Sequence, residues 1–374
     1  MKQKAVVIGA GIVGLATARA LSLKGFNVTV IERTEQAVGA SVRNFGMVWP
    51  IGQPAGEMHN RAQRSKIIWK DIADSTGLPY RDSGSIHTAY YQDEWVVLQE
   101  VYELFKAEGR AVELLDKKGV IEKSGAVNPD NLLGGLYSAS EMIVDPRVAI
   151  GNIAAYLAEF LDVTFIWGKA VSAVENNRVY DGSAWIEADL IFVCSGADFE
   201  TLYPALFAGI EITKCKLQMM RFSNSIPGYD LGASLCGGLS LIHYHSFKAA
   251  PSLKALTQRY ENEMAEYLRY GIHVMVSQNI SGELTVGDSH EYGLTHDPFD
   301  RTAINEMILQ YLRQFALISG WKLTQSWNGV YPKMTNGASH LFLHPSEHVY
   351  ILNGLGGAGM TLSFGLAEEC INPL

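Results

Sequence analysis

The pattern of hydrophobic and polar residues divides the first part of the chain into a strand, a turn, a helix and a second strand. Residues 5–8 and 28–31 are short apolar runs, and residues 12–24 repeat apolar positions at helical spacing. Short apolar runs bounded by turn residues are typical of strands buried in a parallel sheet. The pattern therefore predicts a β-α-β unit at the N-terminus.

The rest of the chain alternates between helical and strand patterns. We expect helices over residues 57–76, 93–108, 146–160, 253–270 and 300–319 and from Thr361 onward. We expect strands over residues 84–90, 163–166, 170–174, 184–186, 189–194 and 349–352, in parts of 211–245, and twice within 272–287. Helices that alternate with strands in this way predict an α/β fold.

Composition and charge narrow the class of protein. The 374 residues are 48% hydrophobic and 18% charged, which provides for a large core and excludes a disordered chain. The net charge is −9 without any block of like charges, which disfavours a nucleic-acid-binding surface. The four cysteines form no Cys-x-x-Cys pair, and no apolar run reaches the roughly 18 residues of a membrane span. We expect a cytoplasmic protein of two domains.

The turn after the first strand has the pattern Gly-x-Gly-x-x-Gly. Its three glycines suit a tight turn, the close approach of a pyrophosphate and the packing of helix on strand, and the start of the helix attracts phosphate. Glu32 ends the second strand 18 residues after Gly14, where a carboxylate accepts hydrogen bonds from ribose hydroxyls and disfavours NADP. The predicted dinucleotide site consists of Gly9, Ala10, Gly11, Ile12, Val13, Gly14 and Glu32, with Arg33 either facing the adenine or solvated.

Two further glycine-bearing stretches are candidate cofactor loops. Residues 354–361 lie between an expected strand and an expected helix, where N–H groups stabilise an anion such as the N1–C2=O edge of a reduced flavin. The alternative for this stretch is a flexible tail loop. Residues 39–46 form a polar loop that is able to donate hydrogen bonds to phosphate, and an ordinary surface loop is the alternative.

Two histidine-containing stretches are candidates for reactive or metal-binding groups. His243 and His245 would share one face of a strand, but no Asp or Glu lies at comparable spacing, so we expect no metal site. Residues 288–291, Asp-Ser-His-Glu, follow an expected strand and form either a catalytic group or a simple turn. The patterns of serine hydrolases, P-loop proteins and zinc peptidases are absent from the sequence.

Together these stretches resemble the D-amino-acid-oxidase-like FAD oxidoreductases, the family of glycine oxidase and sarcosine oxidase, over nearly the whole chain. The resemblance implies a discontinuous Rossmann-like FAD-binding domain over residues 1–78, 143–210 and 328–374. It implies a smaller α+β, sheet-rich substrate domain over residues 79–142 and 211–327. It also implies FAD contacts by Ala40, Ser41, Arg43, Asn44, Phe45, Gly46, Val171, Ser195, Gly196, Trp327, Gly329, Gly354, Gly356, Gly357, Ala358, Gly359, Met360 and Thr361.

The chain departs from the family pattern at three positions. Tyr331 stands where the family has the Arg that holds a substrate carboxylate. Gly329 stands where sarcosine oxidases have a flavin-linking Cys, so the resemblance implies non-covalent FAD. The oxygen-activating Lys of sarcosine oxidases falls near Thr285, which leaves O2 or another electron acceptor open.

Residues 41–50, 241–244 and 287–293 look like one subgroup, which is associated with the breakdown of aminophosphonates. The expected function is oxidation of a small primary or secondary amine to an imine, which hydrolyses to an aldehyde or keto product. The favoured substrate is 2-aminoethylphosphonate or its N-methyl derivative. The candidate substrate-site and catalytic residues are His243, His290, Tyr331 and Lys333.

Other functions remain open at this stage. One is an oxidase or dehydrogenase for glycine, sarcosine or D-amino acids on the same fold. Another is a 2-hydroxy-acid dehydrogenase, for which His290 would serve as the base. A third is a flavin-binding protein without catalytic activity. The oligomeric state is also open.

Overall fold

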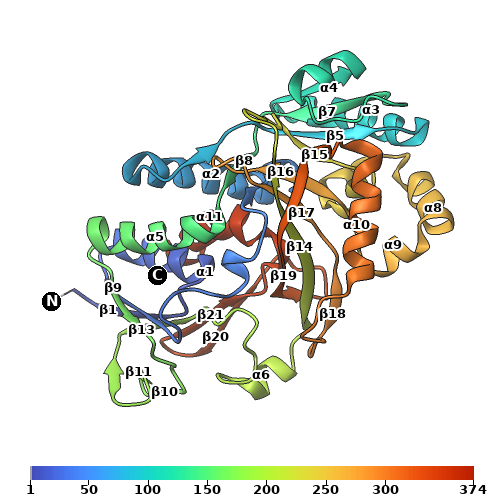
Figure 1. Ribbon diagram of the computed structural model, residues 1–374. Coiled ribbons are helices and arrows are strands. Elements are labelled where there is room, and N and C mark those ends of the chain that lie inside the picture. The colour runs from blue at the N-terminus through green and yellow to red at the C-terminus, as the bar shows by residue number, and fades with distance from the viewer. Residues whose placement is uncertain (1) are drawn as a thin grey trace.

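The computed structural model describes residues 2–374 and has the α/β fold that the sequence pattern predicts (Figure 1). A six-stranded sheet and a nine-stranded sheet dominate the molecule, and two three-stranded sheets accompany them. None of the helices in this described part of the chain combines the length and the apolar character needed to cross a membrane.

The six-stranded sheet brings together segments from the beginning, the middle and the end of the chain. Its strand order is β20-β21-β13-β1-β2-β9, and only the pairing of β20 with β21 is antiparallel. The strands are Lys4–Ile8 (β1), Asn27–Glu32 (β2), Thr164–Trp167 (β9), Leu190–Val193 (β13), Leu341–Ser346 (β20) and Val349–Asn353 (β21). The expected β-α-β unit is therefore part of a parallel sheet.

Four helices are associated with the six-stranded sheet: Ile12–Leu23 (α1), Glu57–Thr76 (α2), Pro146–Leu161 (α5) and Gly359–Ile371 (α11). Helix α1 packs against α5 and α11, and α11 packs against α2. Figure 1 shows α1, α5 and α11 together on one side of the molecule, where both ends of the chain also lie. The C-terminal helix thus returns to the helix that follows the first glycine turn.

The nine-stranded sheet forms the other large layer. Its order is β18-β14-β17-β16-β15-β5-β7-β6, and the long strand β19 pairs with β14. The strands are Ser85–Ala89 (β5), Val112–Asp116 (β6), Gly134–Ser138 (β7), Ile212–Asn224 (β14), Ser234–Cys236 (β15), Met275–Gln278 (β16), Leu284–Gly287 (β17), Glu291–Gly293 (β18) and Trp321–Met334 (β19).

The remaining elements are short or lie around the nine-stranded sheet. The further helices are Gln92–Ala107 (α3), Lys117–Lys123 (α4), Pro204–Ala208 (α6), Leu239–His243 (α7), Leu253–Glu263 (α8), Ala265–Arg269 (α9) and Thr302–Phe315 (α10). The small sheets consist of Met47–Val48 (β3), Tyr80–Arg81 (β4) and Met142–Val144 (β8), and of Ala173–Glu175 (β10), Arg178–Tyr180 (β11) and Trp185–Glu187 (β12).

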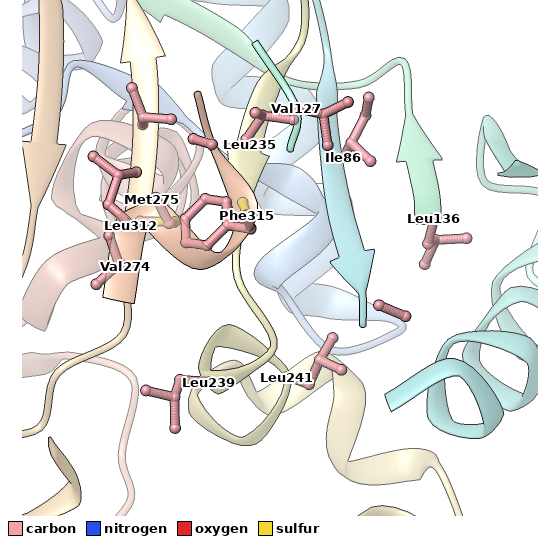
Figure 2. Close-up of a cluster of buried hydrophobic side chains, with 14 of the residues drawn as sticks. Ile86, Val127, Leu136, Leu235, Leu239, Leu241, Val274, Met275, Leu312 and Phe315 are labelled. Carbon is pink, nitrogen blue, oxygen red and sulfur yellow. The ribbon is translucent and has the colours of Figure 1, made fainter. Parts of the chain in front are cut away.

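Helix α10 closes the largest hydrophobic core against the nine-stranded sheet. Ile304, Ile308, Leu312 and Phe315 are buried, which is the spacing of one apolar helix face. Figure 2 shows Phe315 and Leu312 beside Met275 of β16, among the side chains of a core that continues to β5 and β7. Separate hydrophobic clusters surround the six-stranded sheet.

The expectation of strands within residues 211–245 is wrong for the last residues of that range. Residues 239–243 form α7 and residues 245–249 form a 3-10 helix. His243 and His245 therefore do not alternate along a strand. The expected helix over 253–270 is divided in two because Met264 leaves the helical backbone conformation, with φ −126° and ψ 27°. The expected strand over 170–174 begins only at Ala173, where pairing with Tyr180 starts.

Candidate active site

The first glycine turn joins β1 to α1 and leaves no room for side chains at two of its positions. Gly9 has φ +104°, and a Cβ there would lie 2.5 Å from the Cys194 carbonyl oxygen. A Cβ on Gly14 would lie 1.9 Å from the Gly9 carbonyl oxygen. These two glycines are required by backbone packing alone, since both contacts are far shorter than any Cβ tolerates.

Other glycines in the same region have no backbone atom within 4 Å of a would-be Cβ, beyond their own chain neighbours. A Cβ on Gly11 would meet only the Ser41 hydroxyl, at 3.1 Å, and a Cβ on Gly196 would meet nothing within 4 Å. A Cβ on Gly357 would have the Tyr331 hydroxyl as its nearest neighbour, at 3.6 Å. Asn353 Nδ2 donates to the Gly196 carbonyl at 2.9 Å, which ties the middle loop to the last one. These open backbone positions form a cradle for an elongated ligand that contacts main-chain atoms.

The carboxylate of Glu32 is fixed beside this cradle. Its Oε2 accepts from the Ala10 N–H at 2.9 Å, and its Oε1 accepts from the Thr34 hydroxyl at 2.8 Å. Arg33, whose side chain is exposed, pairs with Asp198 at 2.9 Å. Val171 is buried in the same hydrophobic cluster as Ile31, the residue before Glu32. The position of Glu32 suits a ribose hydroxyl, as the sequence predicts.

Residues 40–46 connect the first glycine turn to β19. The Ser41 hydroxyl accepts from the Ile12 N–H at 2.9 Å, and Trp327 Nε1 donates to the Arg43 carbonyl at 3.1 Å. Asn44 is turned onto its own loop: its Nδ2 donates to the Ala40 and Ser41 carbonyls, and its Oδ1 accepts from the Gly46 N–H. These hydrogen bonds of Asn44 hold the shape of the loop.

These features fit a flavin dinucleotide. The open glycines, the start of α1 and the Glu32 carboxylate would hold the adenosine and pyrophosphate. The loop at residues 354–361 would border the flavin ring, where Thr361 Oγ1 accepts from the Trp49 N–H at 2.9 Å and so joins it to the segment after β3. Bound there, FAD supplies two-electron redox chemistry.

A cluster of imidazoles lies next to this loop. The ring centroids of His243 and His273 are 3.5 Å apart, and the ring centroid of His290 lies 5.1 Å from each of them. His290 Nδ1 donates to the Gly271 carbonyl at 2.9 Å. Because a neutral imidazole has one N–H, this bond leaves a lone pair on His290 Nε2, which lies 3.8 Å from Asp288 Oδ2.

Two polar atoms of the cluster lack hydrogen-bond partners among residues 2–374. They are Nδ1 of His273 and Oδ1 of Asp288, both in buried side chains. His273 Nε2 lies 3.1 Å from Asp288 Oδ1, but no hydrogen bond joins the two. Buried polar atoms without partners are costly, so they mark a place where a polar ligand or water is expected.

Burial sets the charge of this cluster. It lowers the pKa of His290 to about 4, and it holds the pKa of His273 well below its usual range. It raises the pKa of the Asp288 carboxyl well above its usual range. Burial therefore disfavours the charged form of each of these groups.

Tyr331 and Lys333 extend the cluster toward the surface. The Tyr331 ring is buried and lies 6.3 Å from the His290 ring, centroid to centroid. Lys333 Nζ lies 3.0 Å from the hydroxyl of the exposed Tyr292. The four candidate residues His243, His290, Tyr331 and Lys333 thus lie together beside the last glycine loop, although they come from three distant parts of the chain.

The histidine arrangement differs from the one that the sequence suggests. His245 is exposed and is not part of the cluster, whereas His243, His273 and His290 offer nitrogens within 4.8 Å of one another. The planes of these three rings are inclined by only 13° to 29°. A metal ion lies in the plane of each imidazole that binds it, so stacked rings suit hydrogen bonds to a ligand better than joint coordination.

The sequence gives no indication of His273 and leaves the role of Asp288 open. His273 lies in a connection before β16, thirty residues from His243, and no spacing pattern relates the two. Asp288 belongs to the polar stretch that the sequence presents as either a catalytic group or a turn, and its approach to His273 depends on the pairing of β16 with β17. A buried Asp-Ser-His directly after a strand was the one signal available.

Comparison with known proteins identifies the family. Residues 4–372 match the family described as FAD dependent oxidoreductase (DAO). The chain is 22% identical to D-amino acid dehydrogenase 2 of Mesorhizobium japonicum, over 97% of this chain and 94% of that protein.

Solved structures agree in fold. Glycine oxidase from Bacillus cereus superposes with a TM-score of 0.79 at 15% identity, over 100% of this chain and 94% of that one. L-α-glycerophosphate oxidase from Mycoplasma pneumoniae, whose structure contains FAD, superposes with a TM-score of 0.72 at 18% identity, over 100% and 95% of the two chains. The protein belongs to the DAO family of FAD-dependent oxidoreductases, and its cofactor is FAD.

Proposed function

We propose that this enzyme oxidises the CH–NH bond of a small amine, with an aminophosphonate such as 2-aminoethylphosphonate or its N-methyl derivative as the preferred substrate. Support for the amine comes from relatives: a D-amino acid dehydrogenase matches almost the full chain, and a glycine oxidase has the same fold. The substrate loses a hydride from carbon and a proton from nitrogen, and water then converts the imine to a carbonyl compound and a free amine.

The observation that carries the proposal is the buried, incompletely hydrogen-bonded cluster of His273, Asp288 and His290 beside Tyr331. An amine nitrogen needs acceptors for its N–H groups, and the lone pair of His290 and the oxygens of Asp288 provide them. The amine must lose its positive charge before hydride transfer, and a buried environment of low polarity favours that neutral form.

The anion of the substrate is expected on the Lys333 side. A carboxylate next to the amine is best held by the planar fork of an Arg, and Tyr331 offers a single hydroxyl instead. Lys333 and Tyr292 supply an ammonium and a second hydroxyl at the outer edge of the cluster. A compact ammonium with separate donors suits a tetrahedral phosphonate, whose oxygens point in three directions.

Thr285 bears on the choice of electron acceptor. Thr285 is buried in β17, and its register partners are Arg221 of β14 and Ser277 of β16. A cation near a flavin promotes reaction with O2, and Thr285 provides none. We propose that O2 is a slow acceptor and that another oxidant serves in the cell.

Anaerobic reduction of the bound flavin tests the proposed function. The holoenzyme is mixed with aminophosphonates, glycine, sarcosine, D-alanine, and 2-hydroxy acids, and loss of the visible flavin absorbance is recorded. We expect rapid bleaching by aminophosphonates and slow bleaching by the rest. Preference for a hydroxy acid would indicate a dehydrogenase with His290 as base, and no bleaching by any compound would favour a flavin-binding protein without catalysis.

A further inference from the structure

Arg221 of β14 is a buried cation with an unsatisfied N–H group. The residue is 3% exposed, and its Nε has no hydrogen-bond partner among residues 2–374. The guanidinium is paired through Nη1, which donates to Asp145 Oδ2 at 3.3 Å and to Glu283 Oε2 at 2.9 Å. A buried N–H without an acceptor is costly in a protein core, so the two ion pairs alone do not account for this side chain.

Arg221 leaves the nine-stranded sheet on the face that carries the candidate cofactor contacts. It lies directly opposite Thr285, so both side chains start on the same face. Met219, two residues earlier on that face, packs with Phe45 and Trp327 in one hydrophobic cluster. Phe45 is part of the loop that connects the first glycine turn to β19. Arg221 therefore lies on the cofactor side of the sheet, one strand away from the position at which sarcosine oxidases have a Lys.

Two carboxylates weaken the electric field of Arg221. Asp145 and Glu283 both contact its Nη1, and Asn279 Nδ2 donates to each of them, at 3.0 and 3.2 Å, which holds the two carboxylates together. Arg147, the further charged side chain near this group, is exposed to solvent, which screens it. A cation between two carboxylates has a much weaker field at a distance than a free cation, because the opposite charges cancel there.

We propose that Arg221 controls the reaction of the reduced enzyme with O2, and that Asp145 and Glu283 keep this reaction slow by cancelling its charge. Reduction of O2 to hydrogen peroxide takes two electrons and one proton from the reduced flavin and a second proton from solvent. The first electron gives O2 a negative charge, which a nearby cation stabilises. Arg221 provides little of this stabilisation while its charge is cancelled, and Thr285 provides none. The inference rests on the proposed function, since it takes O2 as a slow acceptor.

Glu283→Gln tests the inference, because it removes one negative charge and keeps the shape of a side chain that is 40% exposed. The holoenzyme is reduced photochemically without any amine and mixed with O2, and reoxidation is followed by the flavin absorbance. We expect a rate constant about tenfold above that of the wild type, which is the order of effect of one unit charge at a partly buried site. The oxidised variant should also bind sulfite about tenfold more tightly, because sulfite adds to the flavin and gives it a negative charge.

Two further variants separate the cation from its surroundings. In the double variant Arg221→Met, Glu283→Gln, both gains should disappear relative to Arg221→Met, because the cation on which they depend is gone. Glu113→Gln of β6 is the matched control, because it removes an exposed carboxylate at the other end of the same sheet. It should behave as the wild type in both measurements.

Several results would overturn the inference. They are rapid reoxidation of the wild type, no gain in Glu283→Gln, and a gain that persists in the double variant. If Arg221 only ties β14 to the start of α5, Glu283→Gln lowers the unfolding temperature without tighter sulfite binding, which also refutes the proposal. If the double variant does not fold, the two measurements on Glu283→Gln decide alone. No amine enters either measurement, so refutation here leaves amine oxidation intact, and failure of the substrate proposal leaves this inference standing.

Discussion

Glycine serves two different purposes in the cofactor region, and the distinction is visible residue by residue. Gly9 and Gly14 lie against backbone atoms at distances that no side chain permits. A Cβ on Gly11 would instead meet only the Ser41 hydroxyl, and Gly11 lies next to the N–H groups at the start of α1. The sequence pattern predicts a turn, the approach of a pyrophosphate and helix packing for the three glycines, and we propose that Gly11 is the one that borders the pyrophosphate.

Replacement of Gly11 with Val should abolish FAD binding while the fold is retained. The β-branched side chain would occupy the space in which the pyrophosphate approaches the backbone. The flavin content of the purified protein is the measurement, with Gly125→Val as control, because Gly125 is exposed and a Cβ there meets nothing within 4 Å. Normal flavin content in Gly11→Val would show that the cofactor lies elsewhere.

Tyr331→Phe and Lys333→Ala should each lower kcat/KM for 2-aminoethylphosphonate by about tenfold, which corresponds to about 1.4 kcal/mol. The first change removes a buried hydroxyl beside Gly357, and the second removes the cation at the outer edge of the cluster. Activity with glycine should change less, because glycine has no phosphonate. Unchanged kinetics in both variants would remove these residues from the substrate site.

At the scale of elements, the close contact of α1 with the turn after β1 fixes the geometry of the first β-α-β unit. Gly14 lies in the first turn of α1, and its missing side chain lets the helix approach the Gly9 carbonyl. Helix α5 also contains a glycine, Gly151, but a Cβ there meets nothing within 4 Å. The same substitution should therefore have opposite effects in the two helices.

Gly14→Ala should lower the thermal unfolding temperature and the flavin content, whereas Gly151→Ala should leave both unchanged or raise the unfolding temperature slightly. Overpacking of this kind costs about 1–3 kcal/mol, and Gly→Ala on an open helix face gains about 0.5–1 kcal/mol. Calorimetric unfolding of both holoenzymes is the measurement. If Gly14→Ala is as stable as the wild type, α1 must move to accommodate the added methyl group without a loss of unfolding free energy.

The helices and strands differ in how well the sequence predicts them. Long elements with strong periodicity agree closely with the structure, as for α2 and α10, because burial of one face dictates their pattern. The helical segment at residues 239–249 was missed since it is short, and its strand-forming residues are buried by contacts from elsewhere. The histidine cluster was only partly foreseen, because pairing among strands far apart in sequence brings His273 to Asp288.

At the scale of the whole molecule, buried histidines link stability to pH. His87 of β5 is fully buried, and neither ring nitrogen has a hydrogen-bond partner among residues 2–374. Burial lowers its pKa from 6.5 to about 3. Between these values the unfolded chain binds a proton that the folded protein does not, so stability falls as the pH falls through this window.

His87→Leu should reduce this sensitivity to acid. The variant lacks the group that must stay uncharged, so its unfolding temperature at pH 5 should exceed that of the wild type by more than it does at pH 8. Calorimetric scans across this range, with FAD held constant, provide the comparison, and the partly exposed His348→Gln controls for the loss of an imidazole. If the difference in unfolding temperature between His87→Leu and the wild type is the same at all pH values, His87 is not the source of the acid sensitivity.

The central claim is that an amine, and above all an aminophosphonate, is oxidised at the cluster beside the last glycine loop. The most direct test is a single turnover of the anaerobic holoenzyme with 2-aminoethylphosphonate, in which bleached flavin, aldehyde and ammonium are all quantified. The account predicts rapid bleaching and one aldehyde and one ammonium for each FAD reduced. Absence of bleaching, or faster bleaching by 2-hydroxyethylphosphonate or glycine, would contradict it.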